Sequence, residues 1–573
     1  MIVLVGPAPS SRRQAGQRHA LVAVAHVRLV MLAMLFAAAI LLVAGRLAWL
    51  AISAEPATTR DAAAALVPLR GDLVDRTGAP LARTIDAWSI GVHPDRVIGD
   101  RVLLAERLAE LMPERTAGEY LRLLRLPVSF TYLRRRALPE LVSAVNALGE
   151  PGVAFAREPE RLYPQSTMAA HVLGFLDIDG HGRRGMERVL DERLTSQATR
   201  GAPVQLSIDA RVQAAVESEL GYAMTTYHAR GAAGVVLDVH SGEVVAMASL
   251  PAFNPNKLGR VGEDAMRNNV TQSVYELGST FKPLAMAAAI QEGVVTDMSR
   301  RFDATAPIQV GRYRIRDDHA QKRFLNVPEI LIHSSNIGTA RVADEIGQAR
   351  MEKLFRNLGF DTAPDIEIKE KQRPLWPTNW ARTTTMTVAY GHGIAVTPLH
   401  LANAYATMVN GGIWRPATLL KVVPGKEVSG RRVFSQSTSD RMRQLLRLVV
   451  LQGTGRKAEA LGYRVGGKTG TAEVPQAGGY AHNRNVSTFA AVFPMDAPRY
   501  VVIMMIDSAQ RVQENSFQTT AAYTAAPVVS RVIMRTGAML GVQPDLTRDV
   551  DVSDLTPLLW HAPGTKPQPG GAE

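Results

Sequence analysis

Cysteine is absent from all 573 residues of this chain. The protein therefore has no disulfide bonds, no thiolate nucleophile and no zinc site built on cysteine, and its composition is compatible with an oxidising compartment. No internal repeat is visible, and no acidic residue occurs before Glu55. The rest of the composition is ordinary for a folded protein, with 46% hydrophobic and 21% charged residues.

Charge and length narrow the class of protein. The formal net charge is +12, which favours solubility and attraction to an anionic membrane or cell-wall polymer. The chain shows no basic helix and no interleaving of aromatic and basic residues, so we expect no nucleic acid partner. A chain of 573 residues is too long for one hydrophobic core and predicts two or three domains.

An apolar segment at residues 29–52 predicts a transmembrane anchor. Only Arg46 interrupts it, and at about 1.5 Å per residue it is ~36 Å long, enough to span a bilayer. Arginines precede the segment and no acidic residue does, so the positive-inside rule places residues 1–28 in the cytoplasm and exports the rest. A cleaved signal peptide is the alternative, because residues 52–54 loosely resemble a cleavage site. The long basic lead and the length of the apolar run favour an uncleaved anchor.

The rest of the chain divides near residue 230. Residues 60–228 combine strand-like stretches with leucines at helical spacing. Residues 230–540 alternate hairpin and strand patterns with helical ones, which predicts an α/β or α+β domain. Residues 541–573 end in a run of proline and glycine, and we expect them to form a disordered C-terminal tail.

Three short motifs in the second domain together supply a nucleophile, a base, a proton relay and a carboxylate anchor, which are the parts of an acyl-transfer site. Each motif alone occurs by chance, but all three in this order are strong evidence. The candidate residues are Ser279 and Lys282 in Ser-x-x-Lys, Ser334 and Asn336 in Ser-x-Asn, and Lys468, Thr469, Gly470 and Thr471 in Lys-Thr-Gly-Thr.

The first motif places a nucleophile beside a base. On a helix, Ser279 and Lys282 lie one turn apart on the same face, and the N-terminal end of the helix favours a developing oxyanion. A lysine with an ordinary pKa of ~10.4 is a poor base at neutral pH. We therefore expect burial and a second cation, Lys468, to lower the pKa of Lys282. For an isolated Ser-x-x-Lys, a helix-capping serine followed by a solvated lysine would be the better interpretation.

The other two motifs supply the remaining parts. Ser334 can pass a proton between Lys282 and a leaving amine, and Asn336 can hold Lys282 or a substrate amide. The stretch around Lys468 is rich in glycine and reads as a strand along which a substrate backbone could lie, with Lys468 and the two threonine hydroxyls binding a terminal carboxylate. The alternatives are an ordinary helix cap for Ser-x-Asn and a surface strand for Lys-Thr-Gly-Thr.

Metal binding is not expected. His319 and His392 are the tempting ligands, but neither has a partner at the spacing of a metal site. Structural histidines are the better interpretation, and the chemistry needs no organic cofactor.

On these motifs the chain resembles the class B penicillin-binding proteins, the membrane-anchored transpeptidases of peptidoglycan synthesis. The resemblance implies a dimerisation or pedestal domain at 60–228 and a transpeptidase domain with a serine β-lactamase-like fold at 230–540. Tyr275-Glu276 before the nucleophile and the preceding residues 267–271 are more similar to the division-specific FtsI type than to the elongation type. Further matching blocks are Arg70–Ala82, Arg161–Pro164, Ala170–Gly174, Gly185–Glu187 and Gly391–Pro398.

The resemblance implies a ping-pong cross-linking reaction. Ser279 would attack the D-Ala–D-Ala bond of a stem peptide with Lys282 as base, and D-Ala would leave with a proton relayed by Ser334. The backbone N–H groups of Ser279 and Thr471 would form the oxyanion hole, and an amine from a neighbouring stem peptide would take the acyl group. β-Lactams would mimic the dipeptide and remain attached.

The same resemblance implies partners and a location. The substrate would be peptidoglycan stem peptides on glycan made from lipid II, and the partners an FtsW-type polymerase and other division proteins. The protein would cross the inner (cytoplasmic) membrane once, with its N-terminus cytoplasmic and its catalytic domain periplasmic.

Other functions compete with this interpretation. A class A β-lactamase would need a Glu-x-x-Leu-Asn motif between the second and third motifs, and none is present. A D,D-carboxypeptidase differs only in accepting water, and an elongation-type transpeptidase differs in its place in the cell. A non-catalytic scaffold of the division complex would have no need of Lys282.

Overall fold

The computed structural model describes residues 11–53 and 70–560, apart from 178, 260, 312, 424, 427, 477 and 478. The expected disordered tail beyond residue 560 lies outside these residues. The chain separates into two units, residues 1–68 and residues 69–573. Because each unit is compact in itself, each is described separately.

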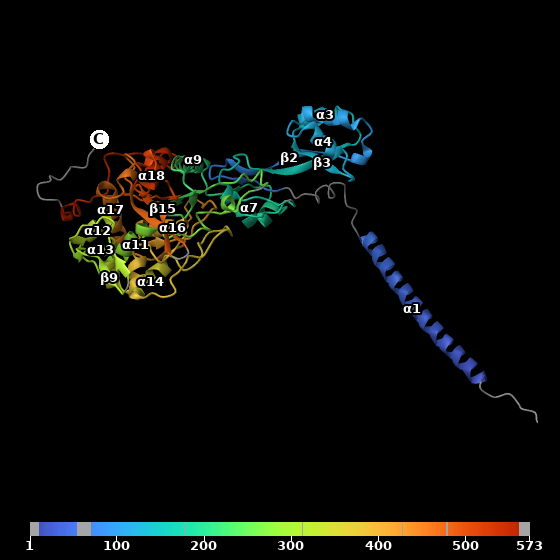
Figure 1. Ribbon diagram of the computed structural model, residues 1–573, viewed down its shortest axis with the longest axis horizontal. Coiled ribbons are helices and arrows are strands. Elements are labelled where there is room, and N and C mark those ends of the chain that lie inside the picture. Colours follow the sequence, from blue (N-terminus) through green and yellow to red (C-terminus); the bar gives the residue numbers. More distant parts are fainter. Residues whose placement is uncertain are drawn as a thin grey trace, which may run out of the picture. The chain divides into compact units, whose positions relative to one another are not determined.

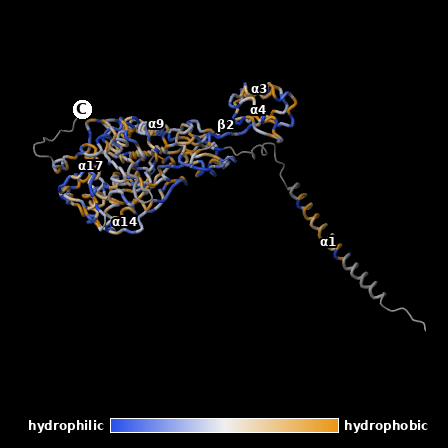
Figure 2. The backbone as a smooth tube through the Cα atoms, in the orientation of Figure 1, coloured by the Kyte–Doolittle hydropathy of each residue, from blue (hydrophilic) through white to orange (hydrophobic). Residues whose placement is uncertain are grey.

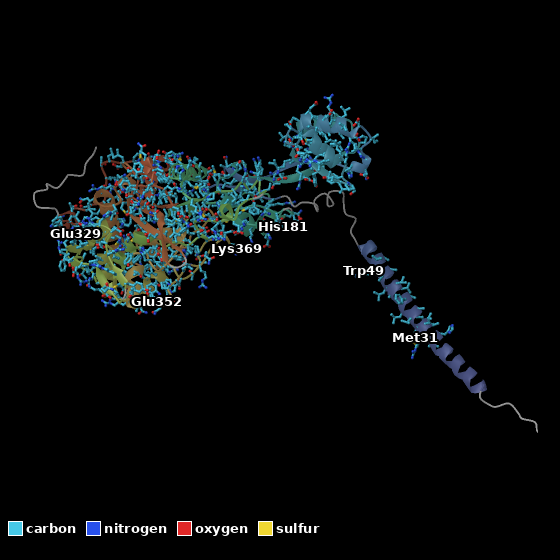
Figure 3. The ribbon with its side chains drawn as sticks, in the orientation of Figure 1. Met31, Trp49, His181, Glu329, Glu352 and Lys369 are labelled. Atoms are coloured by element: carbon cyan, nitrogen blue, oxygen red, sulfur yellow. The ribbon has the colours of Figure 1, made fainter. Side chains whose placement is uncertain are left out.

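The first unit contains one long helix, α1 (Ser11–Ser53). Its stretch from His26 to Trp49 spans 24 residues with a mean hydropathy of 2.6, long and apolar enough to cross a bilayer. The side chains of this stretch are exposed, among them those of Met31 and Trp49, which Figure 3 labels, and the stretch is largely orange in the hydropathy colouring of Figure 2. The predicted long apolar helix is therefore present.

The second unit begins with a small sheet in the order β3-β2-β1-β5, with β4 also paired to β2. Its long strand β2 runs from the base of this region into a helical lobe, where it pairs with β3 beside α3 and α4 (Figure 1). The lobe has its own hydrophobic core, centred on Leu108 and Tyr120. The elements are β1 (Leu73–Val74), β2 (Pro80–Val92), α3 (Arg101–Leu111), α4 (Ala117–Leu124), β3 (Thr131–Ala137), α5 (Pro139–Asn146), β4 (Val153–Leu162) and β5 (Val204–Gln205).

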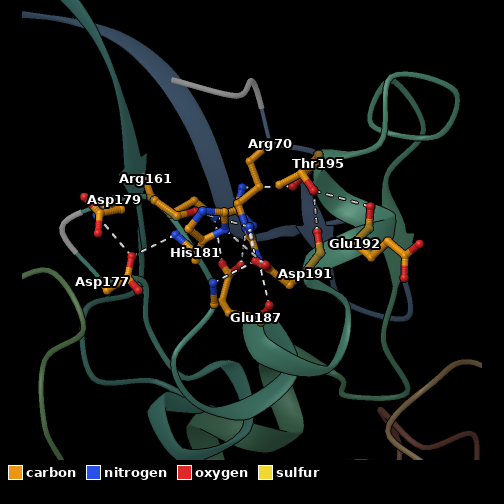
Figure 4. Close-up of polar contacts among 12 residues, drawn as sticks. Arg70, Arg161, Asp177, Asp179, His181, Glu187, Asp191, Glu192 and Thr195 are labelled. Carbon is orange, nitrogen blue, oxygen red and sulfur yellow. Dashed lines mark hydrogen bonds and ion pairs between the residues drawn. The ribbon is translucent and has the colours of Figure 1, made fainter. Parts of the chain in front are cut away.

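A buried ion-pair cluster joins three segments that are distant in the sequence (Figure 4). The carboxylate of Glu187 accepts from Arg70 Nε at 2.6 Å and from Arg161 Nε at 2.7 Å, and Arg70 also reaches Asp191 Oδ1 at 2.6 Å. The side chains of Glu187 and Arg70 are 0% and 2% exposed. Arg161 lies on β4, Glu187 on α7 (Gly185–Val189) and Asp191 on α8 (Asp191–Thr195); α6 (Ala170–Leu173) precedes α7 in the chain.

The large sheet of the second unit is antiparallel, in the order β14-β15-β16-β6-β7. Its central strands β6 and β16 are buried on both faces, which their continuous apolar sequence predicts. Alternate residues of these strands point to opposite faces of the sheet and belong to two separate hydrophobic cores. Figure 1 shows β15 between α18 and α16, which cover opposite faces. The strands are β6 (Gly231–Asp238), β7 (Val244–Leu250), β14 (Gly466–Gln476), β15 (Gly479–Phe493) and β16 (Tyr500–Asp507).

Helices complete the domain on both sides of the sheet. One core packs α9 and α18 against the sheet, and the larger core packs α11, α16 and α17 against its other face. This mixed α/β architecture confirms the predicted fold class. The helices are α9 (Ala210–Thr226), α10 (Glu263–Met266), α11 (Lys282–Gln291), α12 (Val327–Ile332), α13 (Asn336–Ile346), α14 (Gln348–Asn357), α15 (Arg382–Val388), α16 (Pro398–Val409), α17 (Gln436–Gln452) and α18 (Ala525–Thr536), and the short strands are β8 (Arg301–Asp303), β9 (Ile308–Val310), β10 (Tyr313–Ile315), β11 (Phe324–Asn326), β12 (Ile413–Trp414) and β13 (Arg431–Arg432).

Residues 541–560 differ from the expected disordered tail. Leu555 is fully buried in the larger core, and the guanidinium of Arg447 on α17 holds Asp549 at 2.6 Å. The backbone N–H of Trp560 donates to the buried carboxylate of Glu329 at 2.9 Å. Figure 3 labels Glu329. The segment is ordered because a few of its apolar residues, Val542, Leu555 and Leu559, are buried in the two cores of the domain.

We expect Glu187→Gln to destabilise the protein strongly. The substitution leaves two buried guanidinium groups without their shared counter-charge, and breaking such a cluster costs roughly 3–5 kcal/mol in the free energy of unfolding. Thermal unfolding of the detergent-solubilised full chain measures the effect. The control is Asp72→Asn, which removes an ion pair with Arg83 whose side chains are 29% and 49% exposed and which is worth less than about 1 kcal/mol. Equal losses in the two variants would contradict the assignment.

Candidate active site

Ser279 lies at the start of the central helix of the domain. A short 3₁₀ turn, Gly278–Phe281, leads directly into α11, and Gly278 has a φ of +55°, which glycine adopts without strain. The hydroxyl of Tyr405 on α16 donates to the carbonyl of Thr280 at 2.8 Å and fixes the turn from below. The predicted helical context of Ser279 is therefore present.

Strand β14 packs against this turn without room for a side chain. A Cβ added at Gly470 would lie 2.3 Å from the carbonyl oxygen of Leu277, and one added at Gly278 would lie 2.9 Å from the carbonyl oxygen of Thr471. Only glycine fits such an approach of two backbones. The third motif is thereby held directly beside the turn that carries Ser279.

Ser334 projects from the connection between α12 and α13 in a left-handed conformation, with a φ of +56°. That conformation is strained for serine. Asp317 stabilises it by holding the residues that follow Ser334. Asp317 accepts from the hydroxyl of Ser335 at 2.7 Å and from the N–H of Ile337 at 2.9 Å. As a result the carbonyl and hydroxyl of Ser334 both face the amine of Lys282.

Two lysine amines converge on the hydroxyl of Ser334. Lys282 Nζ lies 3.1 Å from Ser334 Oγ and also donates to the Ser334 carbonyl, while Lys468 Nζ lies 3.0 Å from the same hydroxyl. Lys468 is held by the hydroxyl of Thr469 at 3.1 Å and that of Thr454 at 3.4 Å. Both lysines are 0% exposed.

Burial changes the protonation of both amines. Burial lowers the pKa of Lys282 from 10.5 to about 7, partly offset by the negative charges of Asp317 and Asp318. Burial, reinforced by the charge of Lys282, lowers the pKa of Lys468 well below its usual range. The pKa of Lys282 is lowered as expected, but burial alone is the cause. The expected contribution of Lys468 is instead found in the opposite direction, since the charge of Lys282 lowers the pKa of Lys468. At neutral pH the pair can therefore supply a neutral amine, which is the form a general base needs.

A cavity of about 1230 Å³ opens over these groups. Both lysines lie buried beneath its floor. Asn336 Nδ2 donates to the carbonyl of Arg316 at 3.0 Å, so the amide is oriented by the protein itself. Thr471 Oγ1 accepts from the N–H of Ala521 at 3.0 Å and keeps its own proton for a ligand. The cavity is lined by Ser279, Ser334, Asn336, Thr469 and Thr471 among others.

Two residues of the site carry no motif in the sequence. Thr454, just after α17, lines the cavity and lies 2.8 Å from the hydroxyl of Thr469. Asp317 positions the Ser334 turn from a separate loop. Their only sequence signals are a threonine between two glycines and an aspartate pair, both too common to single out. His319 and His392 also line the cavity, and within the described residues no group of three or more His, Asp or Glu side chains could hold a metal.

The arrangement suits acyl transfer through a serine ester. It brings a hydroxyl at a helix start, a bridging hydroxyl and a pair of threonine hydroxyls into one cavity, and a buried amine with a pKa near 7 contacts the bridging hydroxyl. The catalytic roles of the individual residues follow from this geometry as proposals.

Comparison with known proteins independently indicates a transpeptidase. Two family descriptions match: "Penicillin binding protein transpeptidase domain" over residues 232–533 and "Penicillin-binding Protein dimerisation domain" over residues 65–202. A relative in Caulobacter vibrioides, a probable peptidoglycan D,D-transpeptidase FtsI, is 40% identical over 485 residues, covering 83% of this chain and 82% of the relative. The peptidoglycan D,D-transpeptidase FtsI of Escherichia coli K12 is 30% identical over 520 residues, covering 85% and 86%. The crystal structure of penicillin-binding protein 3 from Mycobacterium tuberculosis, complexed with aztreonam, superposes with a TM-score of 0.65 at 26% identity, covering 84% of this chain and 98% of that one.

We expect Lys282→Met to stabilise the fold at neutral and lower pH. The folded pKa of Lys282 is about 7, below its unfolded value of 10.5, so the unfolded chain binds more protons between these values. Stability therefore rises with pH across this window, and below pH 7 the buried ammonium carries its full cost. Removing it should raise the free energy of unfolding by roughly 1–3 kcal/mol at pH 6, with the gain shrinking towards pH 10.

Thermal unfolding of the full chain as a function of pH measures this gain. The matched control is Lys353→Met, which replaces a solvent-exposed lysine on α14 and should give no pH-dependent gain. A loss of stability in Lys282→Met that does not vary with pH would contradict the depressed pKa.

Proposed function

The chain belongs to the class B penicillin-binding proteins of the FtsI type, and on this premise we propose that it is a peptidoglycan D,D-transpeptidase that cross-links stem peptides during septal wall synthesis. One observation carries the proposal: the hydroxyl of Ser334 lies within 3.1 Å of both buried amines, beneath the cavity that Ser279 lines. Membership of the family also implies that the site takes peptidoglycan peptides and β-lactams.

In the first half-reaction, Ser279 Oγ attacks the scissile D-Ala–D-Ala carbonyl while neutral Lys282 takes the hydroxyl proton. The N–H groups of Ser279 and Thr471 stabilise the oxyanion. The C–N bond then breaks, and the departing D-Ala amine receives the proton from Lys282 through the Ser334 hydroxyl. An acyl ester on Ser279 remains, and the catalytic charge balance is restored.

The terminal carboxylate of the donor peptide binds beside Thr469 and Thr471 on β14, the strand that carries the third motif. The hydroxyls of Thr469 and Thr471 face the cavity, and Lys468 supports Thr469 from beneath at 3.1 Å. In the second half-reaction the amine of a neighbouring stem peptide attacks the ester and gives up a proton through Ser334. A new amide forms and Ser279 is released with its proton.

A non-catalytic scaffold and a D,D-carboxypeptidase fit less well. A scaffold has no use for two lysines with depressed pKa values, which destabilise the fold. A carboxypeptidase would use the same residues with water as acceptor, and the FtsI relatives favour transfer to an amine.

The membrane anchor sets the location. The apolar stretch of α1 supports a membrane-anchored protein, and the arginines before it support a cytoplasmic N-terminus. We place the protein in the inner membrane as a single-pass protein, with residues 60–228 as pedestal and residues 230–540 as the periplasmic transpeptidase domain. An FtsW-type polymerase and other division proteins are the proposed partners.

Labelling with a fluorescent penicillin tests the catalytic proposal. The wild-type chain should form a covalent adduct, and Ser279→Ala should form none because the ester oxygen is missing. The acylation rate should rise with pH through about 7, because deprotonation of Lys282 creates the base. Ser299→Ala, at an exposed serine outside the cavity, is the control and should label normally. An undiminished adduct on Ser279→Ala would refute the assignment.

Depletion in the native bacterium, followed by microscopy, tests the septal role. Loss of a septal transpeptidase should block constriction and give filaments, whereas loss of an elongation enzyme should give rounded cells. Expression of Ser279→Ala separates catalysis from scaffolding: only a scaffold would restore division without the nucleophile.

A further inference from the structure

The cavity extends beyond the proposed catalytic residues, towards the end of the sheet where β16 ends and β6 begins. Three arginines from neighbouring strands line this extension: Arg484 on β15, Arg511 just after β16 and Arg230 just before β6. None of them belongs to the three catalytic motifs. Their common position needs a separate explanation.

Backbone and side-chain hydrogen bonds fix the three strand ends together. The N–H of Ser508 donates to the carbonyl of Asn485 at 2.7 Å, and the N–H of Arg230 donates to the carbonyl of Asp507 at 2.9 Å. Arg484 Nε lies 3.3 Å from the hydroxyl of Ser508. Arg230 and Arg484 are thereby held beside the sheet that also carries the third motif, and Arg511 lies four residues beyond the end of β16. These three arginines form the arginine edge.

The edge has an excess of positive charge. Among the described residues, Arg484 and Arg511 form no ion pair, and the Arg230 contact with Asp264 spans 3.9 Å between side chains that are 61% and 78% exposed. The cavity lining includes two carboxylates, Asp318 and Glu473, against four arginines. An anionic group of a ligand would therefore be attracted to this edge.

The geometry of the third motif gives the direction in which a donor peptide would run. The terminal carboxylate of the donor peptide would lie at Thr469, and its scissile carbonyl at Ser279 and Thr471. An extended peptide that continues along β14 rises about 3.3 Å per residue and reaches Glu473 after ~7 Å. Glu473 pairs across the sheet with Asn485, which adjoins Arg484. The segment upstream of the scissile bond is thereby led to the arginine edge.

We propose that Arg484 and Arg511, assisted by Arg230, form a subsite for a free carboxylate of the acyl-donor peptide, upstream of the bond that is cleaved. The inference rests on the proposed transpeptidase function and adds a specificity determinant to it. A guanidinium offers a planar fork of donors that matches a carboxylate and discriminates it from the neutral carboxamide.

A matched pair of synthetic donors tests the subsite. Both are depsipeptides ending in D-Ala–D-lactate, and they differ only at the residue two positions before the acylating D-Ala, which carries a free carboxylate or a carboxamide. The full-length protein in detergent should acylate with the carboxylate donor about fivefold more efficiently, the size expected for an exposed charge pair. The preference should appear in KM and weaken with added salt.

The double variant Arg484→Gln, Arg511→Gln should bring the ratio of the two donors to about one. The control is Arg499→Gln, at an exposed arginine between β15 and β16, at the opposite end of the sheet; it should keep the wild-type ratio. Each variant is first labelled with fluorescent penicillin, which shows that its site is folded.

The outcomes separate the two proposals. A wild-type ratio of one, with normal penicillin labelling, overturns the subsite and leaves the transpeptidase assignment in place. A ratio that survives the double variant also overturns it. No penicillin adduct and no turnover of either donor would instead overturn the proposed function itself.

Discussion

The hydroxyl of Ser334 is shared by two buried amines, and the chemistry of the site depends on this contact. A serine hydroxyl has one proton to donate. Two ammonium groups at 3.0–3.1 Å would both point protons at its lone pairs and would repel each other in a medium of low dielectric. Loss of a proton from one amine relieves this repulsion, and the neutral amine can then accept the hydroxyl proton. A chain of hydrogen bonds along which a proton can move follows directly.

The surrounding fold exists largely to hold that arrangement. Glycines at 278 and 470 let the nucleophile turn and the motif strand touch backbone to backbone. Asp317 stabilises the left-handed conformation of Ser334. The sheet beneath is buried on both faces, and burial of that much apolar surface offsets the cost of two buried lysines.

Much of this could be predicted from the sequence, because motifs report chemistry that local spacing reveals. Ser279 and Lys282 are three residues apart, so a helical turn alone places them in neighbouring positions. The contact between Ser334 and Lys468 joins residues 134 positions apart. Sequence reasoning expected Lys468 to lie near Lys282, but local spacing could not show that the two amines meet at Ser334. Thr454 and Asp317 act through tertiary contacts with common residue types, so no pattern marks them. Residues 541–560 were expected to be disordered because composition does not show that a few apolar residues, Leu555 among them, fill places in a distant core.

Buried charge has opposite consequences in the two halves of the catalytic unit. Around Glu187 each guanidinium meets a carboxylate, and the cluster fixes the pedestal. Around Lys282 and Lys468 the hydrogen-bond partners within the described part of the chain are hydroxyls and carbonyls, with no carboxylate among them, so the fold bears the cost of burying these amines. Glu370 joins the two regions. Its carboxylate accepts from the N–H of Gly185 at 3.2 Å, and its backbone carbonyl accepts from the hydroxyl of Thr271 at 2.6 Å. The pedestal cluster, two residues from Gly185, therefore supports the segment that leads into the nucleophile turn.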